Sequence, residues 1–106
     1  MPLVVELRTR GGRIVRGIPD PSGGTFDAAG DFDQLLDDDS YPTIRQVDPF
    51  GVSTLGSAAL PSLLADITAA LQKARPGVET RGLLRLRRLA ELCQGDRELR
   101  LVVVGD

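Results

Sequence analysis

The sequence Leu99-Arg100-Leu101-Val102-Val103-Val104-Gly105-Asp106 contains the longest run of β-branched apolar residues in the chain. A strand over residues 101–104 has no polar face, so both of its faces need cover. At the border of a sheet, such a strand would invite aggregation. We therefore predict that it lies inside a sheet, and that the rest of the chain supplies neighbouring strands and helices.

Length and composition predict one soluble globular domain over residues 1–106. The chain has 106 residues, of which 42% are hydrophobic and 26% charged, as is typical of such a domain. With one cysteine and no histidine, we predict no internal disulfide, no zinc cluster and no histidine base. No signal peptide is evident, and no apolar run approaches the about 20 residues of a membrane span. We expect a cytoplasmic protein that does not enter the membrane.

Acidic residues gather in one part of the chain. The formal net charge is −2, yet residues 19–48 contain eight Asp against one Arg. The spacing of the aspartates within residues 31–39 does not match a calcium loop. We predict a solvated acidic loop there, with a partner-facing patch as the second alternative and a metal site as the third.

Two strands are predicted near the start, over residues 3–9 and 13–18, because Gly11-Gly12 suits a two-residue hairpin turn. In this register one face carries apolar residues, which are Leu3, Val5, Leu7, Ile14 and Ile18. The other face carries Val15 and several arginines, which are Arg8, Arg10 and Arg13. We expect the arginine face to be solvated, since no aromatic residue accompanies it to form a nucleic-acid contact.

The middle of the chain predicts a loop at residues 19–24, a short amphipathic helix within 28–39 and a third strand over 41–47. That strand ends at Asp48-Pro49-Phe50-Gly51, whose residue types are typical of a type I turn. The small residues at 53–59 predict a loop.

Two helices are predicted over residues 61–74 and 80–94, with Thr80 as an N-cap, because apolar side chains recur at helical spacing. The first stripe consists of Leu60, Leu63, Leu64, Ile67, Leu71 and Ala74. The second consists of Leu83, Leu86, Leu89, Ala90 and Cys93. Cys93 therefore points inward, as a small hydrophobic residue rather than a nucleophile.

The element order β-β-(short α)-β-α-α-β predicts an α+β fold. We expect a single small domain with a mostly antiparallel sheet of about four strands and the helix pair packed on one face. The other face of the last strand then needs cover from residues 19–40 or from a second subunit. In this arrangement Asp48 and Asp106 lie at opposite edges of the sheet, which disfavours a catalytic pair of carboxylates.

The turn Asp48-Pro49-Phe50-Gly51, the helix pair and the last strand ending in Gly105-Asp106 resemble a group of small uncharacterised bacterial proteins. In that group the turn reads Asp-Pro-aromatic-Gly and the final strand ends in Gly-Asp. The likeness covers about residues 44–106, and it implies no particular activity.

Signatures of other chemistry are missing from the sequence. No glycine pair is followed by Lys-Ser or Lys-Thr as in a nucleotide loop, and the serines have no histidine base. The second helix lacks the side chains that read base edges, and the chain is acidic overall, so nucleic-acid binding is disfavoured. We predict no catalytic residue, no cofactor and no metal.

Two functional hypotheses remain. The first is a non-enzymatic protein-interaction module of the immunity, inhibitor or accessory type, with a protein partner or with self-association through the edge of the hairpin. Its contact residues are two exposed leucines beside arginines on the second helix, namely Leu84, Arg85, Arg88 and Leu92. The alternative is a small enzyme or ligand-binding domain that uses the turn and the last residue, namely Asp48, Phe50, Gly51 and Asp106.

Overall fold

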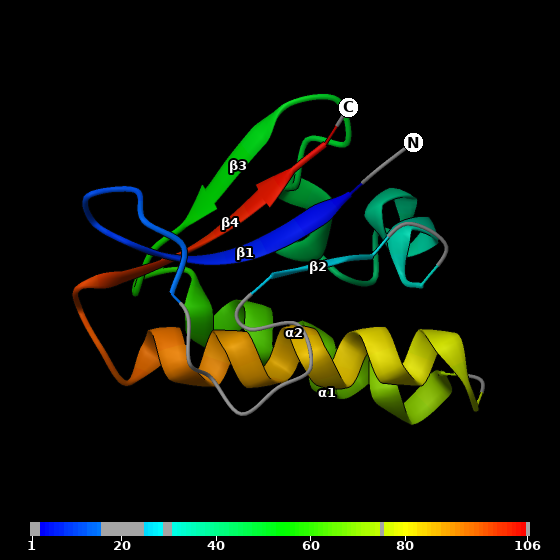
Figure 1. Ribbon diagram of the computed structural model, residues 1–106. Coiled ribbons are helices and arrows are strands. Elements are labelled where there is room, and N and C mark those ends of the chain that lie inside the picture. Colours follow the sequence, from blue (N-terminus) through cyan, green and yellow to red (C-terminus); the bar gives the residue numbers. More distant parts are fainter. Residues whose placement is uncertain (1–2, 16–24, 29–30, 75, 106) are drawn as a thin grey trace.

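The computed structural model describes residues 3–15, 25–28, 31–74 and 76–105. Four strands form one antiparallel sheet, and two α-helices lie along one of its faces (Figure 1). The strands are β1 (Val4–Thr9), β2 (Thr25–Asp27), β3 (Val52–Leu55) and β4 (Leu99–Val104). The helices are α1 (Leu60–Lys73) and α2 (Val78–Gln94), preceded by two short 3-10 helices, η1 (Asp33–Asp37) and η2 (Ile44–Gln46). The predicted small α+β domain, with its helix pair on one face, is confirmed.

Strand β4 lies inside the sheet, as predicted. The strand order is β2-β1-β4-β3, so β4 pairs antiparallel with β1 on one side and with β3 on the other. Leu101 stands opposite both Leu7 of β1 and Leu55 of β3. All three leucine side chains are buried, and such cross-strand apolar contacts stabilise a sheet.

The two faces of β4 are covered in different ways. Leu101 and Val103 belong to the hydrophobic core on the helix side. Val102 points to the opposite, outer face, where it is only 5% exposed. Its register partners there are Glu6 of β1 and Thr54 of β3. Neighbouring strands therefore shield Val102, without a helix on that face.

The outer face of β4 was expected to be covered by residues 19–40 or by a second subunit, and the described part of residues 19–40 does not cover it. Phe32, Leu35 and Leu36, in and beside η1, all belong to the core on the helix side. Residues 19–24 and 29–30 lie outside the described residues. At the end of β4, Val104 stays half-buried, so the described residues cover the outer face only partly at this end.

The turn after β1 differs from the predicted hairpin by one residue. The N–H of Thr9 donates to the carbonyl oxygen of Arg13 at 2.8 Å, which closes a loop of three residues. Gly12 has φ of 91°, the left-handed conformation common at the end of such loops. The extra residue shifts the pairing of residues 13–15 with β1 by one position. The side chains of this segment therefore point to the faces opposite to those predicted. Val15, rather than Ile14, therefore packs against the core.

A different strand takes the place expected for the second strand of the hairpin. Strand β2, which was not predicted, pairs with β1 so that Val5 stands opposite Phe26. Residues 16–18 lie outside the described residues. Because β1 has β2 on one side and β4 on the other, β1 is not an edge, and β2 is the outer strand on this side of the sheet. Self-association at this side would involve β2 and stays a prediction.

Residues 41–47 do not form the predicted third strand. They contain η2, and β3 begins only after the turn, within the segment predicted as a loop. Ile44 and Val47 are three residues apart, which places both on one side of a helical turn, and both are buried. Two apolar residues at this spacing fit a short helix as well as a strand.

A buried carboxylate in α1 holds η2 in position. Asp66 is buried, and its Oδ2 accepts hydrogen bonds from the backbone N–H of Thr43 at 2.7 Å and of Ile44 at 3.1 Å. Thr43 and Ile44 lie at the start of η2, where backbone N–H groups have no partner within the helix. The hydrogen bonds offset the cost of burying the carboxylate.

Helices α1 and α2 confirm the predicted helix pair. Helix α2 begins slightly earlier than expected, at Val78, because Gly77 has φ of 113° and turns the chain before the helix. Thr80 is therefore not its N-cap. Cys93 is fully buried, which confirms that it points into the core.

Candidate protein-interaction site

Helix α2 divides into an inward and an outward side. Its inward side is buried against the sheet and α1, and consists of Gly82, Leu83, Leu86, Leu89, Ala90 and Cys93. The outward side carries the exposed Arg81, Leu84, Arg87 and Arg88. The division follows from the helical period, since residues three or four apart share a face. The outward side is therefore both basic and partly apolar.

The four predicted contact residues on α2 differ in their exposure. Leu84 is 42% exposed, and Arg88 is exposed beside it along the helix. Arg85 is half-buried, and its guanidinium carbon lies 5.8 Å from the centre of the Phe26 ring, within the range of a cation–π contact. Leu92 packs partly against the core, so its expected exposure is wrong.

A shallow depression of about 350 Å³ opens at the first turns of α2. It is lined by Gly77, Thr80, Arg81, Leu84 and Arg85. Val78 lies at the same end of α2 and is 48% exposed. This end of the helix was not among the predicted contact residues, although Gly77 follows Pro76 at a break between two helical patterns and marks where the chain turns. The exposed apolar residues of α2 therefore concentrate around its start.

Helix α2 carries more positive than negative charge. The helix contains four Arg and two Glu. Arg87 lies 3.7 Å from Glu91, Nε to Oε1. Within the described part of the chain, Arg81 and Arg88 have no carboxylate within ion-pair distance. Their charges are directed to solvent, where a partner of opposite charge gains from them.

The acidic segment 31–39 is only partly the solvated loop that was predicted. Asp37 and Asp39 are exposed, and Asp39 pairs with Arg45. The N–H of Ser40 donates to Oδ1 of Asp38 at 2.8 Å, and this backbone hydrogen bond lowers the pKa of Asp38. Asp31, by contrast, is buried.

Asp31 is buried directly against α2. A Cβ placed on Gly82 would lie 2.6 Å from the Cβ of Asp31, so the side chain of Asp31 can pack directly on the helix there only because residue 82 is glycine. Across the described residues, no group of three or more His, Cys, Asp or Glu is arranged to hold a metal ion.

The turn used by the alternative hypothesis lies beside the end of β4. The N–H of Gly105 donates to the carbonyl oxygen of Gly51 at 2.7 Å. The expectation that Asp48 and the end of β4 lie at opposite edges of the sheet is therefore wrong. It assumed that the third strand ends at Asp48, whereas β3 begins after the turn and runs antiparallel to β4. Asp106 lies outside the described residues.

The carboxylate of Asp48 holds its own turn together. Its Oδ1 accepts the N–H of Phe50 at 2.9 Å, and the N–H of Asp48 donates to Oγ of Ser53 at 2.8 Å. A Cβ on Gly51 would lie 2.6 Å from Oδ2 of the same carboxylate. Phe50 is 71% exposed. These contacts are typical of an Asx turn and do not direct the carboxylate at a substrate.

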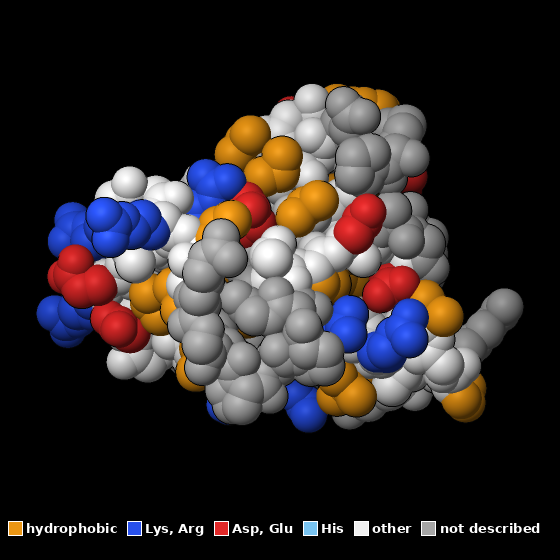
Figure 2. Space-filling view, in the orientation of Figure 1, with side chains coloured by type: hydrophobic (Ala, Val, Ile, Leu, Met, Phe, Trp, Pro, Cys, Tyr) orange, Lys and Arg blue, Asp and Glu red, His pale blue; other side chains and the backbone are white. Residues whose placement is uncertain are grey.

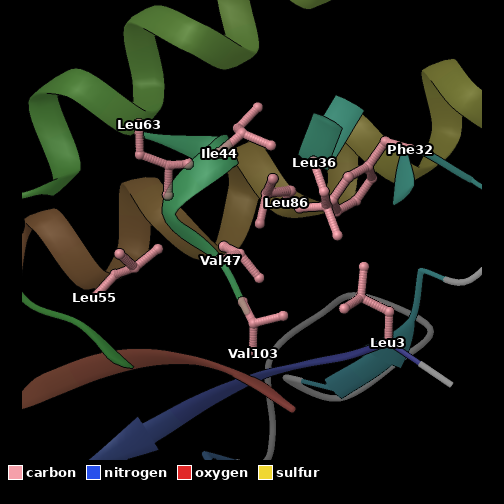
Figure 3. A pocket seen from close by; sticks show the side chains of 9 residues that line it. All are labelled: Leu3, Phe32, Leu36, Ile44, Val47, Leu55, Leu63, Leu86 and Val103. Carbon is pink, nitrogen blue, oxygen red and sulfur yellow. The ribbon is translucent and has the colours of Figure 1, made fainter. Parts of the chain in front are cut away.

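The cavity between the sheet and the helices is too small for a ligand. Its volume is about 10 Å³, close to the smallest space that holds one water molecule. Apolar side chains from all layers of the fold line it (Figure 3), namely Leu3, Phe32, Leu36, Ile44, Val47, Leu55, Leu63, Leu86 and Val103. This cavity belongs to the core, and the exposed side of α2 is the stronger candidate site.

Comparison of the chain with known protein families, with curated proteins and with solved structures finds no match. None of the helices in the described part of the chain is long and apolar enough to cross a membrane.

Proposed function

We propose that this protein is a non-enzymatic interaction module of the cytoplasm, of the immunity, inhibitor or accessory type, and that it binds an acidic partner protein through α2. The observation that carries the proposal is the depression that the exposed Leu84 lines together with Arg81 and Arg85. An apolar anchor flanked by arginines is a common composition of protein contact sites.

The chemistry of this surface defines the partner. Leu84 and Val78 offer apolar area that a partner side chain removes from water. Arg81 and Arg88 attract carboxylates, which steers the encounter and selects acidic surfaces over basic ones. We expect a partner segment that presents Asp or Glu on either side of an apolar residue.

The resemblance to small bacterial proteins is consistent with this role, and we propose that the chain belongs with them. Two of the motifs that carry the resemblance are in contact, namely the turn at Asp48-Pro49-Phe50-Gly51 and the end of β4 at Gly105. Such a contact gives both parts a shared structural role and assigns them no catalytic one.

Affinity capture from cells of the source organism tests the proposal. The wild-type chain is compared with Leu84→Asp, which places a carboxylate in the depression, and with Arg88→Glu, which reverses a charge of the outward side. We expect each variant to bind the captured partner at least about tenfold more weakly, as for a central contact residue. Arg97→Glu is the matched control, because Arg97 is exposed outside α2 and undergoes the same change of charge.

Two results would contradict the proposal. The first is that no stoichiometric partner is recovered under any growth condition. The second is that a partner is recovered but Leu84→Asp and Arg88→Glu bind it as well as Arg97→Glu does. Circular dichroism spectra and melting temperatures of all variants establish that each one is folded.

A further inference from the structure

Strand β3 forms an edge of the sheet. Among the described strands it pairs only with β4. The hydrogen bond from Gly105 to Gly51 fixes which residues of β3 direct their backbone groups at β4, because these residues alternate along an antiparallel ladder. By this alternation, the N–H and C=O groups of Val52 and Thr54 point away from β4, toward the edge.

Strand β3 lacks three of the features that commonly keep sheet edges apart, namely a charge, a proline and a bulge. Residues 49–65 contain no charged side chain, although 26% of the whole chain is charged. Strand β3 contains no proline, and its register with β4 is continuous over all four residues. Proteins usually protect an edge strand with a charge, a proline or a bulge, and β3 is unprotected by any of these.

Apolar side chains continue to this edge. Phe50 and Val52 are the most exposed large hydrophobic residues of the described chain, at 71% and 66%. Val52 stands opposite Val104, which in turn stands opposite Val4 of β1. These three valines form a row across the outer face, and Figure 2 shows hydrophobic side chains gathered over these strands. A further strand beyond β3 would extend the row and cover Val52.

We propose that β3 pairs antiparallel with β3 of a second copy of this chain about a two-fold axis, so that two four-stranded sheets join into one. With Ser53 on the axis, Val52 of one copy stands opposite Thr54 of the other. The backbone groups that point outward then find partners in both copies. The helices of both copies lie on the same side of the joined sheet.

The charges favour a second copy over a foreign strand as the occupant. A two-fold axis brings residues of the same kind together, and the uncharged segment 49–65 meets itself without like-charge repulsion. Strand β3 itself offers no charged side chain that would select a different partner. This pairing uses β3 alone and is independent of the partner site on α2.

Sedimentation velocity of the full chain, from micromolar to millimolar concentration, measures the association. We expect the mass of two chains at the upper end. Val52→Lys places two lysines diagonally across the axis, and we expect it to weaken the dimer by about tenfold or more. Ala69→Lys adds the same charge on the exposed side of α1 and is expected to leave the association unchanged.

Amide hydrogen exchange of the unmodified chain locates the contact. We expect the amides of Val52 and Thr54 to gain protection as concentration rises, whereas those of Ser53 and Leu55 are protected throughout by β4. A monomer at every concentration overturns the proposal. A dimer in which the amides of Val52 and Thr54 stay unprotected overturns it too. Because the exchange experiment uses the unmodified chain, its result does not depend on whether the Val52→Lys variant folds.

Discussion

Gly105 donates its backbone N–H to the carbonyl oxygen of Gly51 at 2.7 Å. This hydrogen bond joins the end of the central strand β4 to the turn that precedes β3. The two backbones approach so closely that a Cβ on Gly105 would lie 2.1 Å from the carbonyl oxygen of Pro49. Glycine is therefore required at position 105 by space, since its φ is not positive.

Gly105→Ala is expected to lower the free energy of unfolding by about 1–3 kcal/mol or more, because the added methyl group forces backbone atoms apart. Chemical denaturation measures the change. Gly56→Ala is the matched control, since its nearest neighbour would be the flexible side chain of Arg100 at 3.7 Å. Equal stability of the two variants would show that the turn does not pack against Gly105 as described.

Asp66→Ala is expected to lower the free energy of unfolding by about 3 kcal/mol, because the backbone N–H groups of Thr43 and Ile44 lose their acceptor in a buried place. Asp37→Ala removes an exposed carboxylate and is expected to cost much less. Urea denaturation of both variants gives the comparison. An Asp66→Ala variant as stable as Asp37→Ala would mean that η2 is not held by α1.

Cys93 links stability to pH. Burial raises the pKa of the Cys93 thiol, so the folded chain keeps the proton longer than the unfolded chain does. The stabilising contribution is complete below the pKa of an unfolded thiol, about 8.5, and is lost as pH rises through the higher folded value. Unfolding free energies on either side of this pH should show a decline that is smaller in Cys93→Ala. An identical decline in both proteins would contradict the burial of the thiol.

If α2 binds an acidic partner, binding should weaken as salt is added. Salt screens exposed charges over about 8 Å at physiological ionic strength, and Arg81 and Arg88 are exposed. Titration calorimetry with the captured partner at low and high salt measures the effect. We expect Arg88→Glu to reduce the salt dependence as well as the affinity. An affinity unaffected by salt would argue for a contact through Leu84 and Val78 alone.

The elements with long, regular apolar patterns could be predicted from the sequence. The run of valines after Leu101 fits only a buried strand, and both helices repeat their leucines over several turns. Short elements were ambiguous for a physical reason. Ile44 and Val47 fit a strand or one helical turn, and the choice depends on Asp66, which lies far along the chain.

The placement of the candidate site depended on these short elements. A strand over residues 41–47 would place the turn at Asp48 after the third strand, whereas the turn precedes β3. The exposure of Leu92 was equally hard to predict. The position of a residue on a helix does not determine which side chains of neighbouring elements pack against it, and Leu92 is partly buried by such packing. Leu84 and Arg88 are exposed, as predicted, because they lie on the outward side of α2.

Photo-cross-linking inside cells of the source organism is the most direct test of binding through α2. A photoreactive phenylalanine analogue replaces Leu84 in one variant and Ala65, on the exposed side of α1, in another. The account predicts a cross-linked product of one defined mass from position 84 and none from position 65. No product at position 84, or the same products from both positions, would contradict it.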